Sequence, residues 1–269
     1  MWERFKTAVV AVVAVLVLLL AVPQIYVFPV ILLVICVAAW EWSVLAGFSA
    51  LASRLFYVGL IAAGALLYWP GLFELPVRPL LWLTGLWWLS ALVMIFLYPL
   101  RIPKAVIFVG GFLTLVPAFF ALVALLRYPE TGAINGPALL LFVLANIFGT
   151  DIGGYFAGRF LGKRKLAPAV SPKKTWAGVG GGLIMAVLIG LAGSAVFELA
   201  WFRLVPLCLL TGMISIVGDL TVSLFKREAG VKDSGTIFPG HGGILDRLDS
   251  IAAAAPLFVA GIMFGHGPW

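Results

Sequence analysis

Three aspartates near the C-terminal end of the sequence are spaced in a way that could bind a metal ion. Asp246 and Asp249 are three residues apart, so a helix would place them on one face. Asp219 lies in an apolar run, where an ionised carboxylate needs a compensating cation, either a metal ion or Lys226. Carboxylate oxygens without Cys or paired His favour Mg²⁺. We therefore predict a magnesium site here, with helix capping as the simpler explanation for Asp246 or Asp249 alone.

The segment between these aspartates has the composition of a phosphate-binding loop. Residues 230–243 hold five glycines and His241, one of two histidines in the chain. Gly242 and Gly243 come directly before a predicted helix start, so their backbone N–H groups could point at a phosphate. Aspartates, lysines, glycines and one histidine, with no evident Ser–His–Asp relay, favour phosphoryl or nucleotidyl transfer, in which the protein positions groups and neutralises charge.

A further aspartate, Asp151, lies inside a long apolar segment. An ionisable side chain within a membrane-spanning helix is expensive, and it is a functional candidate for that reason. Arg159 follows two helical turns later, so a structural ion pair between the two residues is the alternative. Glycines recur every four residues around Asp151, which predicts close helix packing. The glycines of residues 178–182 fit either such packing or a phosphate-binding loop, for which the signal is weak because no strand is expected before them.

Two adjacent lysines, Lys173 and Lys174, precede the next apolar segment. Ser171 and Pro172 before them are typical of an N-cap and a first helical position, so we predict that a helix begins there. Lysines in the first turn oppose the helix dipole by about 0.3–1 kcal/mol each. A bound polyphosphate would remove this conflict. The alternative is that the two lysines only mark the cytoplasmic side of a membrane.

The elements that must position these residues are membrane helices. The 269 residues are 63% hydrophobic, with a mean hydropathy of +1.15, whereas soluble domains are about 45–50% apolar. We predict an all-α integral membrane protein. Its nine transmembrane helices are expected at about residues 8–22, 25–47, 55–72, 79–98, 104–126, 136–161, 177–201, 204–226 and 244–264.

The distribution of charge sets the predicted orientation. With the N-terminus in the cytoplasm, 15 of the 18 Lys and Arg residues fall on the cytoplasmic side, as the positive-inside rule requires. This explains the net charge of +7 without nucleic acid as a partner. The predicted site then faces the cytoplasm, and the C-terminus lies on the opposite side. We interpret residues 1–130, which contain no Asp, as scaffold helices and residues 131–269 as the catalytic half.

The run from Ser223 to Asp249 resembles the signature of the phosphatidate cytidylyltransferase (CDP-diacylglycerol synthase) family, nearly without gaps. The residues that carry the resemblance are Ser223, Lys226, Arg227, Lys232, Asp233, His241, Gly242, Gly243, Asp246, Arg247 and Asp249. Further similarity covers residues 151–158, 171–175 and 218–220. One position departs from the family pattern, because Ala177 stands where the family often has Glu. No role of that acid carries over to this chain.

The resemblance implies transfer of a cytidylyl group from CTP to phosphatidate, which gives CDP-diacylglycerol and pyrophosphate for phospholipid biosynthesis. It implies Mg²⁺ as cofactor, with a second cation left open, and Asp219, Asp246 and Asp249 as the metal ligands. The implied catalytic residues are Asp219, Asp246, Asp249, Lys226, Arg227 and His241. The implied substrate-binding residues are Asp151, Ser171, Lys173, Lys174, Thr175, Ser223, Lys232, Asp233, Gly242, Gly243 and Arg247.

The expected partners are CTP, phosphatidate and membrane lipids, in a multi-pass protein of the cell (inner or plasma) membrane, and a homodimer is left open. Two other functions stay in view. A CTP-dependent kinase acting on a lipid alcohol would use the same kinds of residue but would release CDP instead of pyrophosphate. An ion-coupled transporter could use Asp151 and Asp219 within the membrane. A transporter would not need Asp246 and Asp249 beside a glycine-rich loop.

Overall fold

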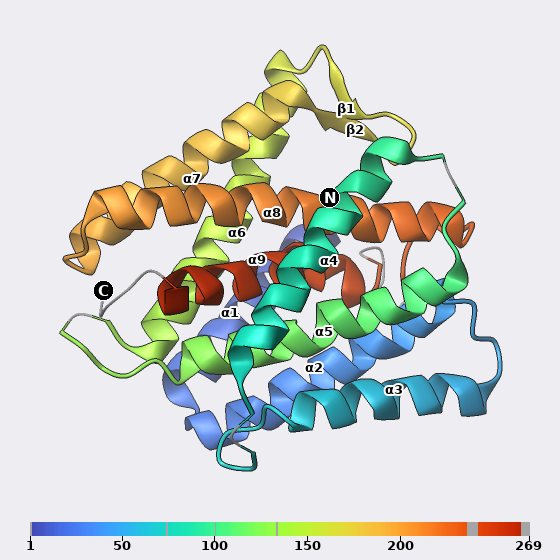
Figure 1. Cartoon of the computed structure of the whole chain (residues 1–269). Coiled ribbons are helices and arrows are strands. Elements are labelled where there is room, and N and C mark those ends of the chain that lie inside the picture. Colours follow the sequence, from blue (N-terminus) through green and yellow to red (C-terminus); the bar gives the residue numbers. More distant parts are fainter. Residues whose placement is uncertain (1, 74, 100, 133, 236–241, 265–269) are drawn as a thin grey trace.

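The described part of the chain forms a bundle of nine helices and one β-hairpin (Figure 1). The computed structural model describes residues 2–73, 75–99, 101–132, 134–235 and 242–264. In chain order the helices are α1 (Trp2–Ala21), α2 (Gln24–Leu45), α3 (Leu51–Leu66), α4 (Val77–Leu97), α5 (Lys104–Leu126), α6 (Gly136–Leu161), α7 (Trp176–Val196), α8 (Trp201–Glu228) and α9 (Leu245–Phe264). Between α6 and α7, β1 (Lys165–Ala167) pairs antiparallel with β2 (Ser171–Thr175).

Each predicted span coincides with a helix, although several ends differ by several residues. Within the described residues, seven helices, α2 and α4 to α9, are long and apolar enough to cross a membrane. The apolar segments Val12–Ala21 and Leu51–Leu66 are shorter. Large apolar side chains such as Phe96, which is 71% exposed, lie on the outside of the bundle, as lipid contact requires. The chain is therefore a multi-pass helical membrane protein, and the count of nine spans stays a prediction.

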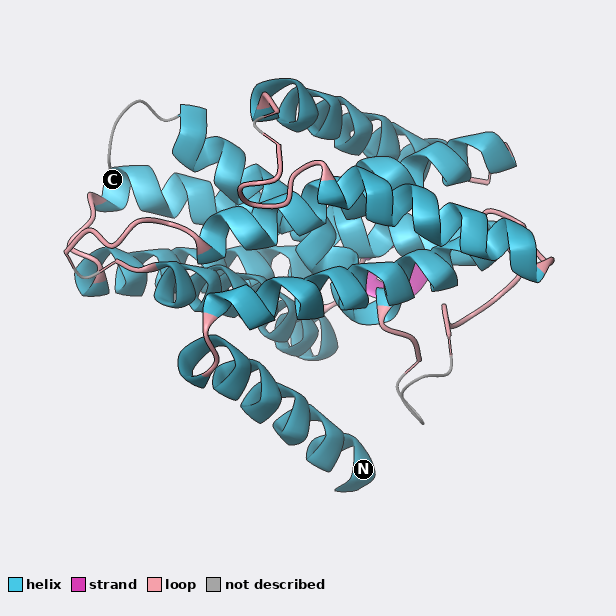
Figure 2. Cartoon of the chain, turned by 90° about the horizontal axis from the view of Figure 1, so that it is seen from below, coloured by secondary structure: helices cyan, strands magenta, loops and turns pink. Residues whose placement is uncertain are grey.

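The first helix is set apart from the others. Figure 2 shows α1 projecting from the rest of the bundle. Its side chains Val10 and Leu20 are about two-thirds exposed, at 65% and 66%. The positioning of the polar residues described below therefore rests on α2 and the later helices.

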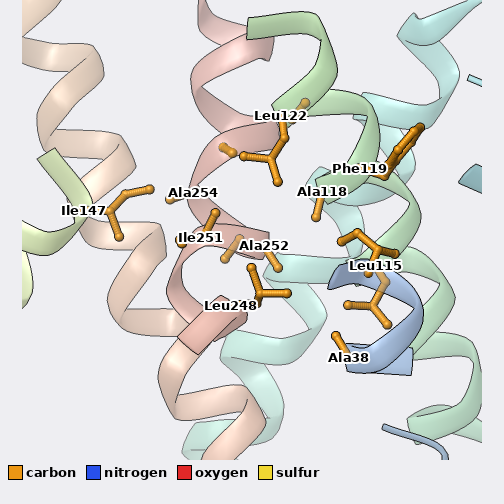
Figure 3. Packing of buried hydrophobic residues seen from close by; sticks show 14 of the residues in the cluster. Ala38, Leu115, Ala118, Phe119, Leu122, Ile147, Leu248, Ile251, Ala252 and Ala254 are labelled. Atoms are coloured by element: carbon orange, nitrogen blue, oxygen red, sulfur yellow. The ribbon is translucent and has the colours of Figure 1, made fainter. Parts of the chain in front are cut away.

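The core lies where α5 packs against α9 (Figure 3). Leu115 and Phe119 of α5 are completely buried, and the alanines from Ala252 to Ala255 of α9 are at most 1% exposed. In a membrane, lipid tails are as apolar as the side chains, so close contact between small residues is what holds helices together. The enclosed position of α9 fixes the first turns of this helix, which carry Asp246 and Asp249.

Glycines bring α6 and α7 into backbone contact, as the sequence predicted. A Cβ atom on Gly154 would lie 3.2 Å from the carbonyl oxygen of Gly178, and one on Gly153 would meet the carbonyl oxygen of Gly181. Any larger residue at these positions would push the two helices apart. The close approach places the end of α6 beside the start of α7, where the hairpin connects them (Figure 1).

The predicted helix start at Ser171 and Pro172 is wrong. Residues Ser171–Thr175 form strand β2, and α7 begins at Trp176. Thr175 is the actual N-cap, because its Oγ1 accepts the Gly178 N–H at 3.1 Å. A β-branched residue suits the end of a strand, and its hydroxyl can also cap a helix. The two lysines therefore lie on an extended strand, and no conflict with the helix dipole arises.

The connections between helices lie at two ends of the bundle. In Figure 1 the α2–α3 turn, the β-hairpin and the α8–α9 segment lie on the right, and the α5–α6 and α7–α8 connections lie on the left. This alternation is what successive membrane crossings produce. It places the hairpin, the C-terminal end of α8 and the start of α9 at one end of the molecule.

Candidate active site

A cavity of about 800 Å³ opens between α6, α7, α8, α9 and the β-hairpin. Its volume is within the range of about 300–1,000 Å³ that is typical of small-molecule sites. Ten residues predicted for the site line this cavity: Asp151, Lys173, Lys174, Thr175, Asp219, Lys226, Asp233, Asp246, Arg247 and Asp249. The tertiary structure thus brings the predicted residues that precede α7 in the chain into one cavity with those that follow it.

Asp219, on α8, is paired with a lysine from the hairpin. The Nζ atom of Lys174 is 2.7 Å from Asp219 Oδ2, and these side chains are 25% and 31% exposed. Ser223, one turn along α8, donates its hydroxyl to Asp219 Oδ1 at 3.2 Å. Of the two compensating cations predicted for Asp219, Lys226 is not the partner, because it binds Asp246 instead. The strand β2 carries Lys174 across the cavity to Asp219.

Asp246, at the start of α9, has both carboxylate oxygens engaged. Lys226 Nζ donates to Oδ1 at 2.6 Å, and both side chains are only 12% exposed. The backbone N–H groups of Ser234 and Gly243 donate to Oδ2, each at 3.0 Å. Asp246 therefore ties the end of α8, the α8–α9 segment and the start of α9 together. Three donors on one carboxylate make a firm anchor, since hydrogen bonds to an ionised group are stronger than neutral ones.

Asp249 lies one turn deeper in α9 and is only 8% exposed. Its Oδ1 accepts the N–H of Ser250 at 2.7 Å, and its charge repels that of Asp219. Gly218 makes this proximity possible, because a Cβ atom there would meet the carbonyl oxygen of Asp249. A cation at this position would relieve the repulsion between the two carboxylates.

Asp151 faces the same cavity from α6. Its charge interacts with those of Lys174 and Asp219. The alternative of an ion pair with Arg159 is not found, because the Arg159 guanidinium donates to the Tyr155 hydroxyl at 2.9 Å. Arg159 and Tyr155 also line the cavity, and both are exposed. Asp151 therefore shares the cavity with Lys174 and Asp219, and it does not form the ion pair with Arg159 that a structural role in α6 would require.

Three predicted site residues on the hairpin and α8 lie outside the cavity lining. Arg227 donates its Nε–H to the carbonyl oxygen of Val170 at 3.3 Å, which ties α8 to the hairpin. Ser223 acts through Asp219, as described above. Ser171 is the first residue of β2 and pairs with Ala167. These three residues hold Asp219 and the hairpin in place and do not face the cavity.

Predicted residues in the α8–α9 segment have different placements. Lys232 is exposed, and Gly242 adopts a positive φ of 82°, which glycine tolerates best. The Gly243 N–H donates to Asp246, so in this structure it is not free for a phosphate. His241 lies outside the described residues. The predicted contacts of these residues with a triphosphate stay predictions.

One residue of the first half reaches the site and was missed. Glu41, on α2, is 3% exposed and accepts hydrogen bonds from Ser234 and from two backbone N–H groups at the start of α9. A signal was present in the sequence, because Glu41 lies within an apolar segment, as Asp151 does. The rule that marks Asp151 as a functional candidate marks Glu41 equally.

The donor set is suited to a hard cation that is shared with a substrate. Among the described residues, no three His, Cys, Asp or Glu side chains form a ready-made metal-binding group. Mg²⁺ is usually bound by one or two carboxylates, with water and substrate phosphates completing its shell. Asp219 and Asp249, which repel each other, fit that requirement. The residues present therefore fit Mg²⁺.

Comparison with known proteins adds an independent finding. Residues 2–264 match the model of the cytidylyltransferase family. The phosphatidate cytidylyltransferase of Pseudomonas aeruginosa is 38% identical over 254 residues, which cover 84% of each chain. That of Haemophilus influenzae is 35% identical over 281 aligned positions, covering 95% of this chain and 96% of the relative. That of Synechocystis is 45% identical over 130 residues, covering 46% of this chain and 42% of the relative.

Proposed function

The chain belongs to the cytidylyltransferase family, and from this premise we propose that it transfers the cytidylyl group of CTP to phosphatidate. The products are CDP-diacylglycerol, a precursor for phospholipid biosynthesis, and pyrophosphate. The observation that carries the proposal is one cavity in which Asp219, Asp246 and Asp249 lie beside Lys174 and Lys226. Carboxylates for a metal and lysines for phosphates, at the end of a helix bundle with lipid-facing sides, are what a reaction between a nucleotide and a lipid requires.

The reaction joins a phosphate oxygen of phosphatidate to the α-phosphorus of CTP. The bond between that phosphorus and the oxygen leading to the β-phosphate breaks, and pyrophosphate leaves with the electron pair. A phosphate monoester is already largely ionised near neutral pH, since its second pKa is about 6. The protein therefore needs no dedicated base, and its task is to position both substrates and neutralise charge.

Mg²⁺ would be held by Asp219 and Asp249, while Asp246, predicted as a main ligand, already accepts three hydrogen bonds. When bound, the ion would neutralise phosphate oxygens of CTP. Lys174 and Lys226 already lie against Asp219 and Asp246. Lys174 can turn from Asp219 to the incoming phosphates, which would leave that carboxylate free, whereas the more buried Lys226 stays with Asp246. A second cation and a homodimer stay predictions.

The site is proposed to face the cytoplasm, where CTP is made. The hairpin and the segments beside it carry most of the basic residues, in line with the positive-inside rule. Arg159, on the exposed side of α6 next to Phe156 and Phe160, would receive the phosphate of phosphatidate from the lipid side. Phe156 and Phe160 are 52% and 72% exposed, so acyl chains could lie against them.

The test is pyrophosphate release by the purified full chain with CTP, Mg²⁺ and phosphatidate, each omitted in turn. We expect release only in the complete mixture, together with a lipid product that contains cytidine. A parallel reaction replaces phosphatidate with diacylglycerol. Formation of CDP in that reaction, without pyrophosphate in the first, would replace the proposal with a lipid kinase.

A further inference from the structure

Glu41 of α2 is a buried carboxylate that binds residues 193 to 204 positions further along the chain. Its Oε2 accepts the Ser234 hydroxyl at 2.9 Å and the Leu245 N–H at 2.8 Å, and its Oε1 accepts the Ile244 N–H at 3.1 Å. Only 3% of Glu41 is exposed. Both oxygens of this carboxylate are therefore committed to the α8–α9 segment and the start of α9.

The segment is shaped to fit this carboxylate. A Cβ atom on Gly235 or on Gly243 would collide with the Glu41 carboxylate. Both glycines allow the backbone to approach the acid closely, and a side chain at either position would force it away. Among the described residues, no Lys or Arg forms an ion pair with Glu41. Its charge is instead stabilised by the Ser234 hydroxyl and by two backbone N–H groups at the positive, N-terminal end of α9.

We infer that Glu41 is a positioning residue of the active site, acting through the start of α9. It binds Ser234, Ile244 and Leu245, and the N–H groups of Ser234 and Gly243 in turn bind Asp246. Glu41 thereby sets where Asp246 and Asp249 lie relative to Asp219. The inference rests on the proposed function for its kinetic readout, and it makes α2 part of the catalytic arrangement.

A merely structural role would have different consequences. Loss of a packing residue lowers the amount of folded protein but leaves the turnover of each folded molecule unchanged. Loss of a positioning residue lowers turnover in protein that is still folded. It also loosens the start of α9, residues 242–250, and leaves distant helices protected from hydrogen exchange.

The variant Glu41→Gln keeps the shape of the side chain and removes its charge. Its NH₂ group must face a backbone or hydroxyl donor. We expect kcat to fall about 10–100-fold, the effect usual for groups that orient metal ligands. The Mg²⁺ concentration for half-maximal activity should rise, and the KM for phosphatidate should change less than about threefold. Glu130→Gln, an exposed acid in the α5–α6 connection, is the matched control and should behave as wild type.

Hydrogen exchange supplies a readout that does not depend on activity. In Glu41→Gln, the backbone amides of residues 242–250 should exchange faster than in wild type, and those of α5 should not change. Ser234→Ala should have a smaller effect because two of the three donors remain. The double variant should be less than additive, since both changes affect one network.

These measurements separate the possible failures. Unchanged kcat together with unchanged exchange in Glu41→Gln would overturn the inference, and so would a loss of activity fully explained by a smaller folded fraction. If the wild type shows no transfer from CTP to phosphatidate, the proposed function fails. The exchange of residues 242–250 would still decide whether Glu41 holds the start of α9.

Discussion

The cavity contains two lysine–aspartate pairs that differ in burial and in number of partners. The outer pair, Lys174 and Asp219, joins the hairpin to α8 and is 25% and 31% exposed. The inner pair, Lys226 and Asp246, joins α8 to α9 and is 12% exposed on both sides. Besides its lysine, Asp219 accepts one hydroxyl, whereas Asp246 accepts two backbone N–H groups.

This difference in burial gives the two ion pairs different roles. A partly exposed ion pair is worth about 0–1 kcal/mol, so a ligand can replace it at little cost. Removing one partner of a buried pair leaves an uncompensated charge and costs about 3–5 kcal/mol. The outer pair is therefore suited to exchanging partners with substrate and metal. The inner pair is suited to keeping the α8–α9 segment in place.

The largest effect is expected from Asp219→Asn, in the outer pair. Turnover should fall about 10²–10³-fold, because a carboxylate that would hold the metal is lost. The free energy of unfolding should change by less than about 1 kcal/mol, since the ion pair is partly exposed. Pyrophosphate release and thermal unfolding measure the two quantities. Near-normal turnover would remove Asp219 from the metal site.

Asp246→Asn, in the inner pair, should affect both activity and stability. The free energy of unfolding should fall by about 3 kcal/mol, because the amide leaves Lys226 unpaired in a nearly buried position. Thermal unfolding of Asp246→Asn and Asp219→Asn, side by side in the same detergent, makes the comparison direct. Equal losses of stability in the two variants would break the distinction between the pairs.

The lysine of the outer pair should act mainly on nucleotide binding. Lys174→Gln should raise the KM for CTP about tenfold, the value of one hydrogen bond from a charged group. The KM for phosphatidate should change much less. Lys163→Gln, an exposed lysine outside the cavity lining, is the control. If both KM values rose equally, Lys174 would not discriminate between the substrates.

The smallest effect tests the strand that carries Lys174. Thr175→Ala removes the observed N-cap of α7 and should lower the free energy of unfolding by about 1 kcal/mol. Ser171→Ala, at the cap position expected from sequence, is the matched control and should have almost no effect. Chemical denaturation of both variants measures the difference between their free energies of unfolding. A larger loss of stability in Ser171→Ala than in Thr175→Ala would indicate that the helix begins at Ser171.

The positions of the membrane helices followed directly from the sequence. An apolar run of roughly 20 residues must form a helix in lipid, whatever its neighbours do, because its backbone groups have no other partner there. The three-residue spacing beside the glycine-rich loop marked Asp246 and Asp249. Asp151 and Asp219 were found for a reason related to that of the helices. A carboxylate inside an apolar segment is so costly that it is conspicuous without any knowledge of the fold.

Contacts across the cavity could not be read in the same way. Which lysine binds which aspartate depends on the strand β2, which begins at Ser171 where a helix was expected. Ser171 and Pro172 fit a helix start locally, and only the pairing of β2 with β1 makes them part of a strand. Local propensity is a weak guide when a tertiary contact offers the backbone different hydrogen bonds.

The sequence by itself determined that this is a helical membrane protein of the cytidylyltransferase family with carboxylates inside apolar segments. Hydropathy and the cost of buried charge act on each segment separately, so a single chain reveals them. The tertiary structure decided that Lys174 binds Asp219, that Lys226 binds Asp246, and that Glu41 holds the start of α9. These contacts join residues from different elements, so no rule that acts on one segment at a time predicts them.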